Sequence, residues 1–303
     1  MAMISTGSVN KALWPGVNAW VGLSYSEHPL ELSEIFDVYQ SDKNFEEDVN
    51  VFGFGLATVK PETASVQYDE SGQGWVQRYT HVRYALGFII SEDAIEDNLY
   101  MELAQKRSKA LALSIRQTEE NVAANVLNRA FNSSYTLADG LELCSTAHLK
   151  SKGGTYSNEL ATSVDLSELA LEQSCIDIMN MTNDASLKIR IMPRKLIVPP
   201  ALAFEAERIL KSSLQSDTSN NALNALKSKG VLPDGYTVNH YLTDNDAFFI
   251  KTDCPDGLKM FRRLGLDIKN DTDFDTGSIK YKASTKFSVG ASDPRGVFGS
   301  PGA

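Results

Sequence analysis

Residues 91–131 read SEDAIEDNLYMELAQKRSKALALSIRQTEENVAANVLNRAF and contain neither glycine nor proline. Five apolar residues recur at spacings of 7, 4, 7 and 4, which places them on one stripe of an α-helix. This predicted core face, the spine core face, consists of Ala104, Leu111, Ile115, Val122 and Val126. The opposite face is predicted to be solvated and carries Lys106, Lys109, Arg116, Glu119 and Glu120.

The start of this helix has two readings. Ser91 can cap a first turn whose Glu92 and Asp93 complement the helix dipole. Alternatively, the polar pair at 97–98 interrupts the helix, which then begins near Leu99. A continuous helix would extend about 60 Å at about 1.5 Å per residue. Either reading predicts a long amphipathic helix, which a compact enzyme core does not obviously require.

The clearest strand pattern lies near the end of the chain, at residues 278–289. One parity is apolar and predicts a buried face: Ile279, Tyr281, Ala283, Phe287 and Val289. The other parity carries serines and lysines and predicts a solvated, basic face. Lys280, Lys282 and Lys286 on that face are candidates for weak contact with nucleic-acid phosphates, although a solvated strand face is the more ordinary reading.

A long β-hairpin is predicted between residues 49 and 90. Alternation indicates a first strand at 51–58 and a longer second strand at 76–90, with a polar, glycine-containing loop between them. The hairpin is too poor in apolar residues to pack wholly on its own core, so we expect it to contact a neighbouring subunit. The predicted contact residues are Lys60, Glu62, Asp69, Glu70 and Trp75.

The remaining segments have weaker patterns. Residues 1–48 scatter aromatic side chains without periodicity, so this arm is expected to lie across the fold or across another copy. In the centre, Asp165 is expected to open a helix with Glu168 as its capping-box partner. Further helices are expected from Pro200 and at 218–230, and strands at 195–198, 236–242 and 247–251.

Composition excludes several classes of protein. The 303 residues are 42% hydrophobic and 22% charged, which is ordinary for a globular chain. The net charge is 29 − 39 = −10, which argues against a surface built to neutralise phosphates. No apolar run is long enough to cross a bilayer, and no secretory signal is visible. Three cysteines indicate no disulfide framework.

No catalytic, cofactor-binding or metal site is predicted. The pair Gly53 and Gly55 lacks the third glycine and the helix of a dinucleotide-binding loop. Cys144 and His148 are four residues apart but have no second ligand pair, so a buried thiol and a loop histidine are the expected reading. The aspartates at 271, 273 and 275 resemble the start of a calcium loop, yet the required glycine and glutamate are misplaced.

The order of arm, hairpin, long helix, compact centre and late strand resembles the major capsid proteins of tailed bacteriophages, which have the Hong-Kong-97-like fold. At the level of amino-acid sequence, the chain is most similar to Mu-type major head subunits. The similarity is carried by segments across residues 50–303, none of them a catalytic signature: FIISEDAIEDN at 88–98, TEENVAANVL at 118–127, LELCSTAH at 141–148, LIVPPAL at 196–202 and RGVFGSPGA at 295–303.

This resemblance implies an α+β fold with an N-terminal arm, an extended hairpin loop, a spine helix, and peripheral and axial domains. The arm would be residues 1–48 and the extended loop 49–90. The spine helix and first part of the peripheral domain would span 91–159, and the axial domain 160–240. Residues 241–303 would supply the late peripheral strands and the tail.

The resemblance also implies a function. The chain would be a major capsid subunit that self-assembles into pentamers and hexamers of an icosahedral shell around double-stranded DNA. Its partners would be a portal, a separate scaffolding protein and, in some relatives, a decoration protein, with no membrane and no cofactor. The chain would reside in the virion after assembly in the host bacterial cytoplasm. An encapsulin-like compartment shell and an acidic cytosolic enzyme remain as alternatives.

Overall fold

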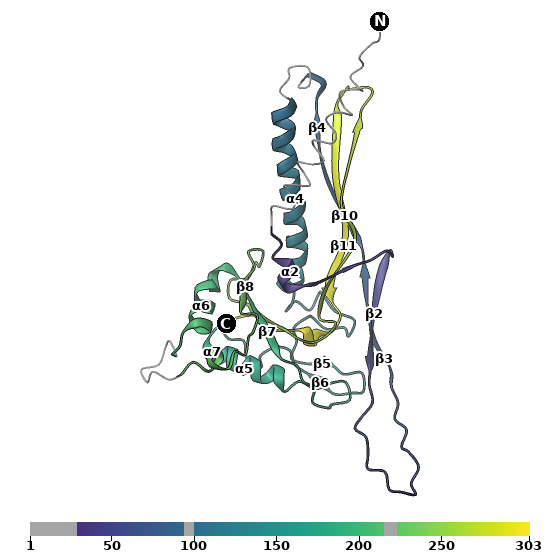
Figure 1. Ribbon diagram of the computed structural model, residues 1–303, viewed down its shortest axis with the longest axis vertical. Coiled ribbons are helices and arrows are strands. Elements are labelled where there is room, and N and C mark those ends of the chain that lie inside the picture. The colour runs from purple at the N-terminus through teal and green to yellow at the C-terminus, as the bar shows by residue number, and fades with distance from the viewer. Residues whose placement is uncertain (1–28, 94–99, 215–222) are drawn as a thin grey trace.

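Two four-stranded sheets and a long helix form the framework of the computed structural model, which describes residues 29–93, 100–214 and 223–303 (Figure 1). The first sheet has the order β1-β10-β11-β4 and the second has the order β12-β9-β7-β8. The strands of the first are β1 (Asp37–Gln40), β10 (Leu258–Thr272), β11 (Ile279–Ala291) and β4 (Val82–Ile90). Those of the second are β12 (Val297–Ser300), β9 (Phe248–Thr252), β7 (Pro193–Val198) and β8 (Tyr236–Val238).

The predicted long helix is α4 (Tyr100–Asn128), which runs along the first sheet (Figure 1). A start near Leu99 lies outside the described residues. Leu111 and Ile115 pack on Ala283 of β11, and this cluster fixes the helix on the sheet. Ala104 is also buried, but Val122 and Val126 are only partly buried. The spine core face is therefore fully covered over its first half alone.

Glu119 and Glu120 were expected on the solvated face of the helix, and that expectation is wrong. Glu119 is fully buried and lies 3.2 Å from Nη2 of Arg262, a residue of β10. Glu120 is 3% exposed, and its Oε2 accepts a hydrogen bond of 3.1 Å from the backbone N–H of Leu32. Both carboxylates are buried because distant segments supply their partners, which spacing along one helix cannot reveal.

Replacing Glu120 by glutamine should stabilise the protein at alkaline pH. Burial raises the pKa of the Glu120 carboxyl from 4.5 to about 7. The pKa of Glu120 is higher in the folded than in the unfolded state. Its contribution to the free energy of unfolding is therefore fully present below about pH 4.5 and is lost as the pH rises through 7. Glu120→Gln keeps an acceptor for Leu32 without the charge, so we expect a gain of up to about 3 kcal/mol at pH 8.

Thermal melts at pH 4.5 and pH 8 measure this effect. The variant should melt higher than the parent at pH 8 and nearly level with it at pH 4.5. Glu62→Gln, a change to an exposed carboxyl of the loop, is the matched control and should show no such pH-dependent gain. A melting temperature of Glu120→Gln at or below that of the parent at pH 8 would contradict the assignment.

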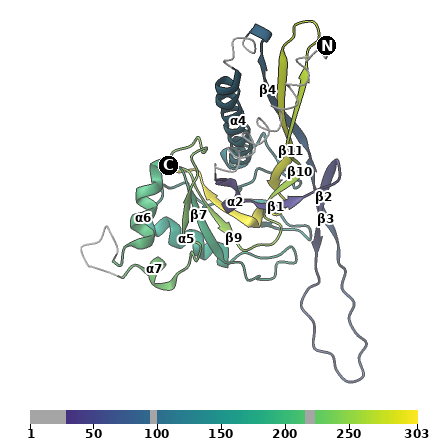
Figure 2. The same cartoon turned by 45° about the horizontal axis from the view of Figure 1, so that its top comes forward.

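The hairpin exists, but its strands differ from the prediction. β2 (Phe45–Phe52) pairs with β3 (Gly72–Thr80), so the first strand is not at 51–58. Residues 53–71 form no strand, and the hairpin projects from the body in both views (Figures 1 and 2). The expected strand at 76–90 divides at His81 into β3 and β4, which belong to different sheets. The buried parity changes there, from Tyr79 in β3 to Ile90 in β4.

The late strand is confirmed as β11, and its apolar parity faces the core. Its partner β10, fifteen residues long, was not predicted. Register irregularities between Arg262 and Leu264, and again before Asp267, break the alternation that would have revealed it. The polar parity of β11 is not wholly solvated: Ser284 is shielded between neighbouring strands, and Ser288 is covered by His81.

The described part of the predicted arm packs on its own subunit. The short helix α2 (Leu32–Ile35) and Phe36 are buried in the core that α4 shares with the first sheet. β1 then adds to β10 as a parallel strand. Trp14, Trp20 and Tyr25 lie outside the described residues. Residues 29–40 therefore lie across their own subunit, the first of the two expected placements: Leu32, Ile35 and Phe36 enter the core, and β1 is an exposed edge strand.

The second sheet carries the compact centre of the chain. Its core packs against α5 (Glu168–Met179), α6 (Ala203–Lys211) and α7 (Ala225–Lys229). Helix α5 is capped by Ser167, whose Oγ accepts from the N–H of Ala170, and not by Asp165 as expected. The proposed domain boundary at 240 separates β8 from β9 and β12, which share this sheet. The remaining elements are β5 (His148–Leu149), β6 (Thr155–Tyr156) and two 3-10 turns, η1 (Pro200–Leu202) and η2 (Pro294–Gly296).

Candidate subunit-contact surfaces

The loop at residues 53–71 is the most exposed apolar segment of the described chain. Every side chain in it is exposed, and the loop lies beyond the paired part of the hairpin (Figure 1). Its large apolar side chains are 56–94% exposed: Phe54, Leu56, Val59, Val66 and Tyr68. Exposed apolar surface of this kind marks an interaction site.

The five predicted hairpin residues occupy three different places. Lys60 precedes the turn at the far end of the loop, and Glu62 lies within that turn. Asp69 lies farther back, where hydrogen bonds from backbone N–H groups, that of Gly55 first, hold the pKa of its carboxyl below the ordinary value. The carbonyl of Glu70 accepts a 2.9 Å hydrogen bond from Lys152. Trp75 lies at the base, half-buried in its own subunit.

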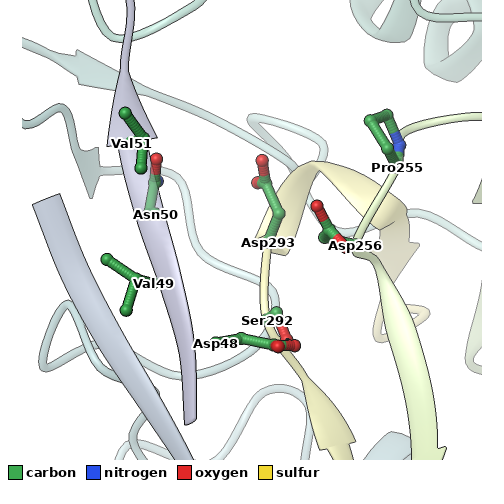
Figure 3. A pocket seen from close by; sticks show the side chains of 8 residues that line it. All are labelled: Asp48, Val49, Asn50, Val51, Pro255, Asp256, Ser292 and Asp293. Atoms are coloured by element: carbon green, nitrogen blue, oxygen red, sulfur yellow. The ribbon is translucent and has the colours of Figure 1, made fainter. Parts of the chain in front are cut away.

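A charged network anchors the base of the hairpin to the body. Asp48 of β2 accepts from Nζ of Lys259 at 2.7 Å and from Oγ of Ser292 at 2.5 Å. Lys259 also binds Asp256 at 2.6 Å. Asp48, Asp256 and Ser292 border a cavity of about 400 Å³ in which Asp48 and Ser292 lie close together (Figure 3). Since Lys259 balances two carboxylates, we interpret the network as a structural brace that orients the hairpin.

His81 braces the same junction, between β3 and β4. Its ring nitrogens lie 2.9 Å from Oγ of Ser288 and 3.1 Å from Oγ of Ser41. Burial lowers the pKa of His81, with the nearby Lys286 acting in the same direction. The neutral imidazole can donate through one nitrogen and accept through the other, which matches two hydroxyl partners. The hairpin thus leaves the body in a defined direction.

The three predicted lysines share one face of β11, as expected from their parity. Their charge is partly offset, because Lys280 forms an ion pair of 2.6 Å with Asp273. Lys286 donates to the side-chain oxygen of Asn44 at 3.0 Å, and Lys282 is exposed. The stripe is therefore a weaker anion-binding surface than three unpaired lysines would make.

The residues considered for catalysis do not form a reactive pair. His148 is buried, with Nδ1 2.6 Å from Asp139 and Nε2 3.3 Å from the carbonyl of Leu143. Burial raises the pKa of the Cys144 thiol well above its ordinary value, so this cysteine is a poor nucleophile. Across residues 29–93, 100–214 and 223–303, no three His, Cys, Asp or Glu side chains are grouped to hold a metal ion. Among the same residues, no helix has the length and apolar character needed to cross a membrane.

Sequence reasoning missed the contacts that join distant segments. The Glu119–Arg262 pair and the Asp48–Lys259 pair each connect residues more than a hundred positions apart. Neither pair has a local sequence signal. The partial exposure of Val122 and Val126 was also missed, because an apolar residue on a helical stripe is ordinarily read as core.

Comparisons with known proteins define the class of fold. The solved structure of Mycobacterium phage Che8 matches at 16% identity with a TM-score of 0.53, over 90% of this chain and 92% of that one. Microbacterium phage Oxtober96 matches at 8% identity with a TM-score of 0.52, over 90% of each chain. The procapsid of bacteriophage JBD30 matches at 12% identity with a TM-score of 0.51, over 98% of this chain and 76% of that one.

These likenesses confirm the capsid fold of the Hong-Kong-97-like type. A family model described as phage capsid protein matches residues 75–299. The chain belongs to this phage capsid protein family, and it is a structural subunit of the capsid shell. No curated protein matches it. The special closeness to Mu-type subunits stays a prediction.

Proposed function

We propose that the chain forms pentamers and hexamers that close into an icosahedral shell around double-stranded DNA, with assembly in the host bacterial cytoplasm. The observation that carries this proposal is the loop at 53–71. Its apolar side chains are exposed on the isolated subunit, and the loop projects away from the body of the subunit (Figure 1). Contact with another copy of the chain would bury these side chains. In a closed ring, every subunit would make the same head-to-tail contact with the next one.

The proposed contacts involve more than the loop's apolar residues. Lys60 and Glu62 at the far end of the loop, and Asp69 and Glu70 behind it, would lie at the polar rim of the contact. Trp75, half-buried at the base, would stabilise the hairpin within its own subunit. Within the spine core face, Ala104, Leu111 and Ile115 would hold α4 on the sheet of its own subunit.

The proposed partners beyond the shell itself follow from family resemblance. They are a portal, a separate scaffolding protein and, where the virion has one, a decoration protein. The proposal includes no enzymatic activity and no cofactor. An encapsulin-like compartment is less well supported, since the matching family is that of phage capsids.

Electron microscopy of the purified protein tests the proposal. Negatively stained samples, prepared with and without a crowding agent, should contain rings, tubes or closed shells. A preparation that stays a uniform monomer by microscopy and light scattering under all these conditions would contradict self-assembly. It would revive the reading of the chain as an acidic enzyme.

DNA binding by unassembled subunits should be weak and independent of sequence. The chain carries a charge of −10, and of its three candidate lysines Lys280 is already paired with Asp273. At most about three phosphates can be neutralised, so affinity should fall only shallowly with added salt. A mobility-shift assay on two unrelated duplexes at physiological salt measures this. Nanomolar binding, or a preference for one duplex, would contradict it.

A further inference from the structure

An apolar groove lies beside the second half of α4, where that helix meets the end of β11. Its volume is about 300 Å³, and it is open to solvent on one side. The walls are formed by Val122 and Val126 from the helix, Leu137 from the following loop, and Val289 from β11. Val122 and Val126 are partly buried: they pack against the neighbouring core cluster and also line this groove.

The lining of the groove is mixed, with polar as well as apolar side chains. Gln77, Asn125 and Thr136 provide hydrogen-bonding groups there, and the sole charged side chain in its lining is that of Arg129. The guanidinium of Arg129 lies over the ring of Tyr135, 4.2 Å from the ring centre. Among the residues that the structure describes, none with a carboxylate lines the groove, so the local charge of the described lining is positive. An occupant should therefore combine an apolar body, a hydrogen-bonding tip and negative charge.

The loop at 53–71 has this chemistry. Tyr68 is 92% exposed and offers an aromatic ring with a hydroxyl at its tip. Glu70 lies two residues later, on the same side of an extended chain. Counting Lys60 against Glu62, Asp69 and Glu70, the loop has a net charge of 1 − 3 = −2. Its chemistry is complementary to a groove whose single charge is positive.

The loop cannot fill the groove of its own subunit. Gln77 at the groove belongs to β3, whereas Tyr68 precedes that strand by several residues. Nine extended residues separate the two by about 30 Å at about 3.3 Å each. Both views show the hairpin running straight away from the body (Figures 1 and 2). If this loop occupies the groove, it therefore comes from a second copy.

We propose that the groove beside α4 receives Tyr68 from the extended loop of a second copy of the chain. Glu70 of that loop then lies near Arg129, at the rim of the groove. The contact is head-to-tail, because each subunit offers a loop at one end and a groove elsewhere, and repetition closes a ring. This inference rests on the proposed self-assembly and adds the receiving surface to it.

Photocrosslinking identifies the receiving surface directly. The variant Tyr68→p-benzoylphenylalanine keeps an aromatic side chain and forms a covalent bond with its neighbour on irradiation. Assembled shells of this variant would be irradiated, and the crosslinked peptides identified by mass spectrometry. We expect a band of twice the subunit mass, with loop peptides joined to peptides from residues 122–143 or 289–291.

The same substitution at Phe274 is the matched control. Phe274 is 99% exposed at the turn between β10 and β11, and it should not crosslink to residues 122–143. A second variant, Val126→Trp, fills the groove while keeping an apolar side chain. It should reduce shell yield at least tenfold without lowering the melting temperature of the subunit.

The outcomes separate this proposal from the proposed function. Shells that form normally but crosslink Tyr68 to other segments would overturn the groove assignment and leave self-assembly intact. Shells of Val126→Trp in parental yield would overturn it as well. A parental protein that forms no assembly in the microscopy above would overturn both.

Discussion

Replacing residues 53–71 by the two-residue turn Asn-Gly should abolish shell assembly and leave a folded, soluble subunit. Phe52 and Gly72 are cross-strand partners, so a short turn can close the hairpin directly after them. All side chains removed are exposed, and among the described residues the one ion pair lost is the surface contact of Lys152 with Asp69, which contributes little to stability. Folding stability should change by less than about 1 kcal/mol, while assembly loses its main apolar contact.

Electron microscopy and a thermal melt together measure this result. A second variant keeps the length of the loop but replaces its five large apolar side chains by serine. If side-chain burial drives assembly, that variant also fails to form shells, whereas a role for loop length alone would leave it competent. Normal shells from the Asn-Gly variant would show that the loop is not an essential contact.

The sequence was most informative where a single helix or strand shows its own hydrophobic periodicity. The α4 stripe and the apolar parity of β11 are both local periodicities, and both were found in the expected positions. The exposed loop was foreseen only in part: its polar, glycine- and proline-containing stretch after residue 58 was expected as a loop, but residues 53–58, with Phe54 and Leu56, were expected as a strand.

Sequence periodicity gave wrong or missing predictions where the surroundings of a residue come from two different elements. Glu119 is read as a surface residue on a helical wheel, yet Arg262 and the hydroxyl of Thr285 come to it from the sheet. β10 escaped detection because its irregularities shift the parity along the strand. The division between β3 and β4 was missed for a similar reason. The chain stays extended through His81 but passes there from one sheet to another, and the parity of the buried side chains changes. In each case the missing information is long-range.

For the candidate contact surfaces as well, the sequence predicted local features and missed those formed by several segments. Exposed loop residues could be predicted as a group, but their spacing did not show that Asp69 folds back on Gly55. The groove could not be predicted at all. Val122 and Val126 satisfy the helical stripe, and only the position of the following loop and of β11 shows that they remain partly open. Surfaces made from several segments need the fold before they can be recognised.

Leu111→Asp should be the most damaging single substitution in the spine core face. Leu111 is 4% exposed and packs with Ile115 on Ala283 of β11, at the place where α4 is held on the sheet. An aspartate there loses the apolar contact and buries a carboxylate among apolar neighbours. We expect a cost of about 3–5 kcal/mol, a large part of the stability of an ordinary domain. The variant should be insoluble, or should melt at least 10 °C below the parent.

Leu113→Asp is the matched control for this change. It introduces the same residue two positions away on the same helix, where the parental side chain is 37% exposed and water can solvate the carboxylate. We expect Leu113→Asp to stay soluble and to lose less than about 1 kcal/mol. Chemical denaturation of both variants beside the parent measures the difference. Equal stability of the two would mean that the helix presents a different face to the sheet, because only the orientation of α4 distinguishes these neighbouring positions.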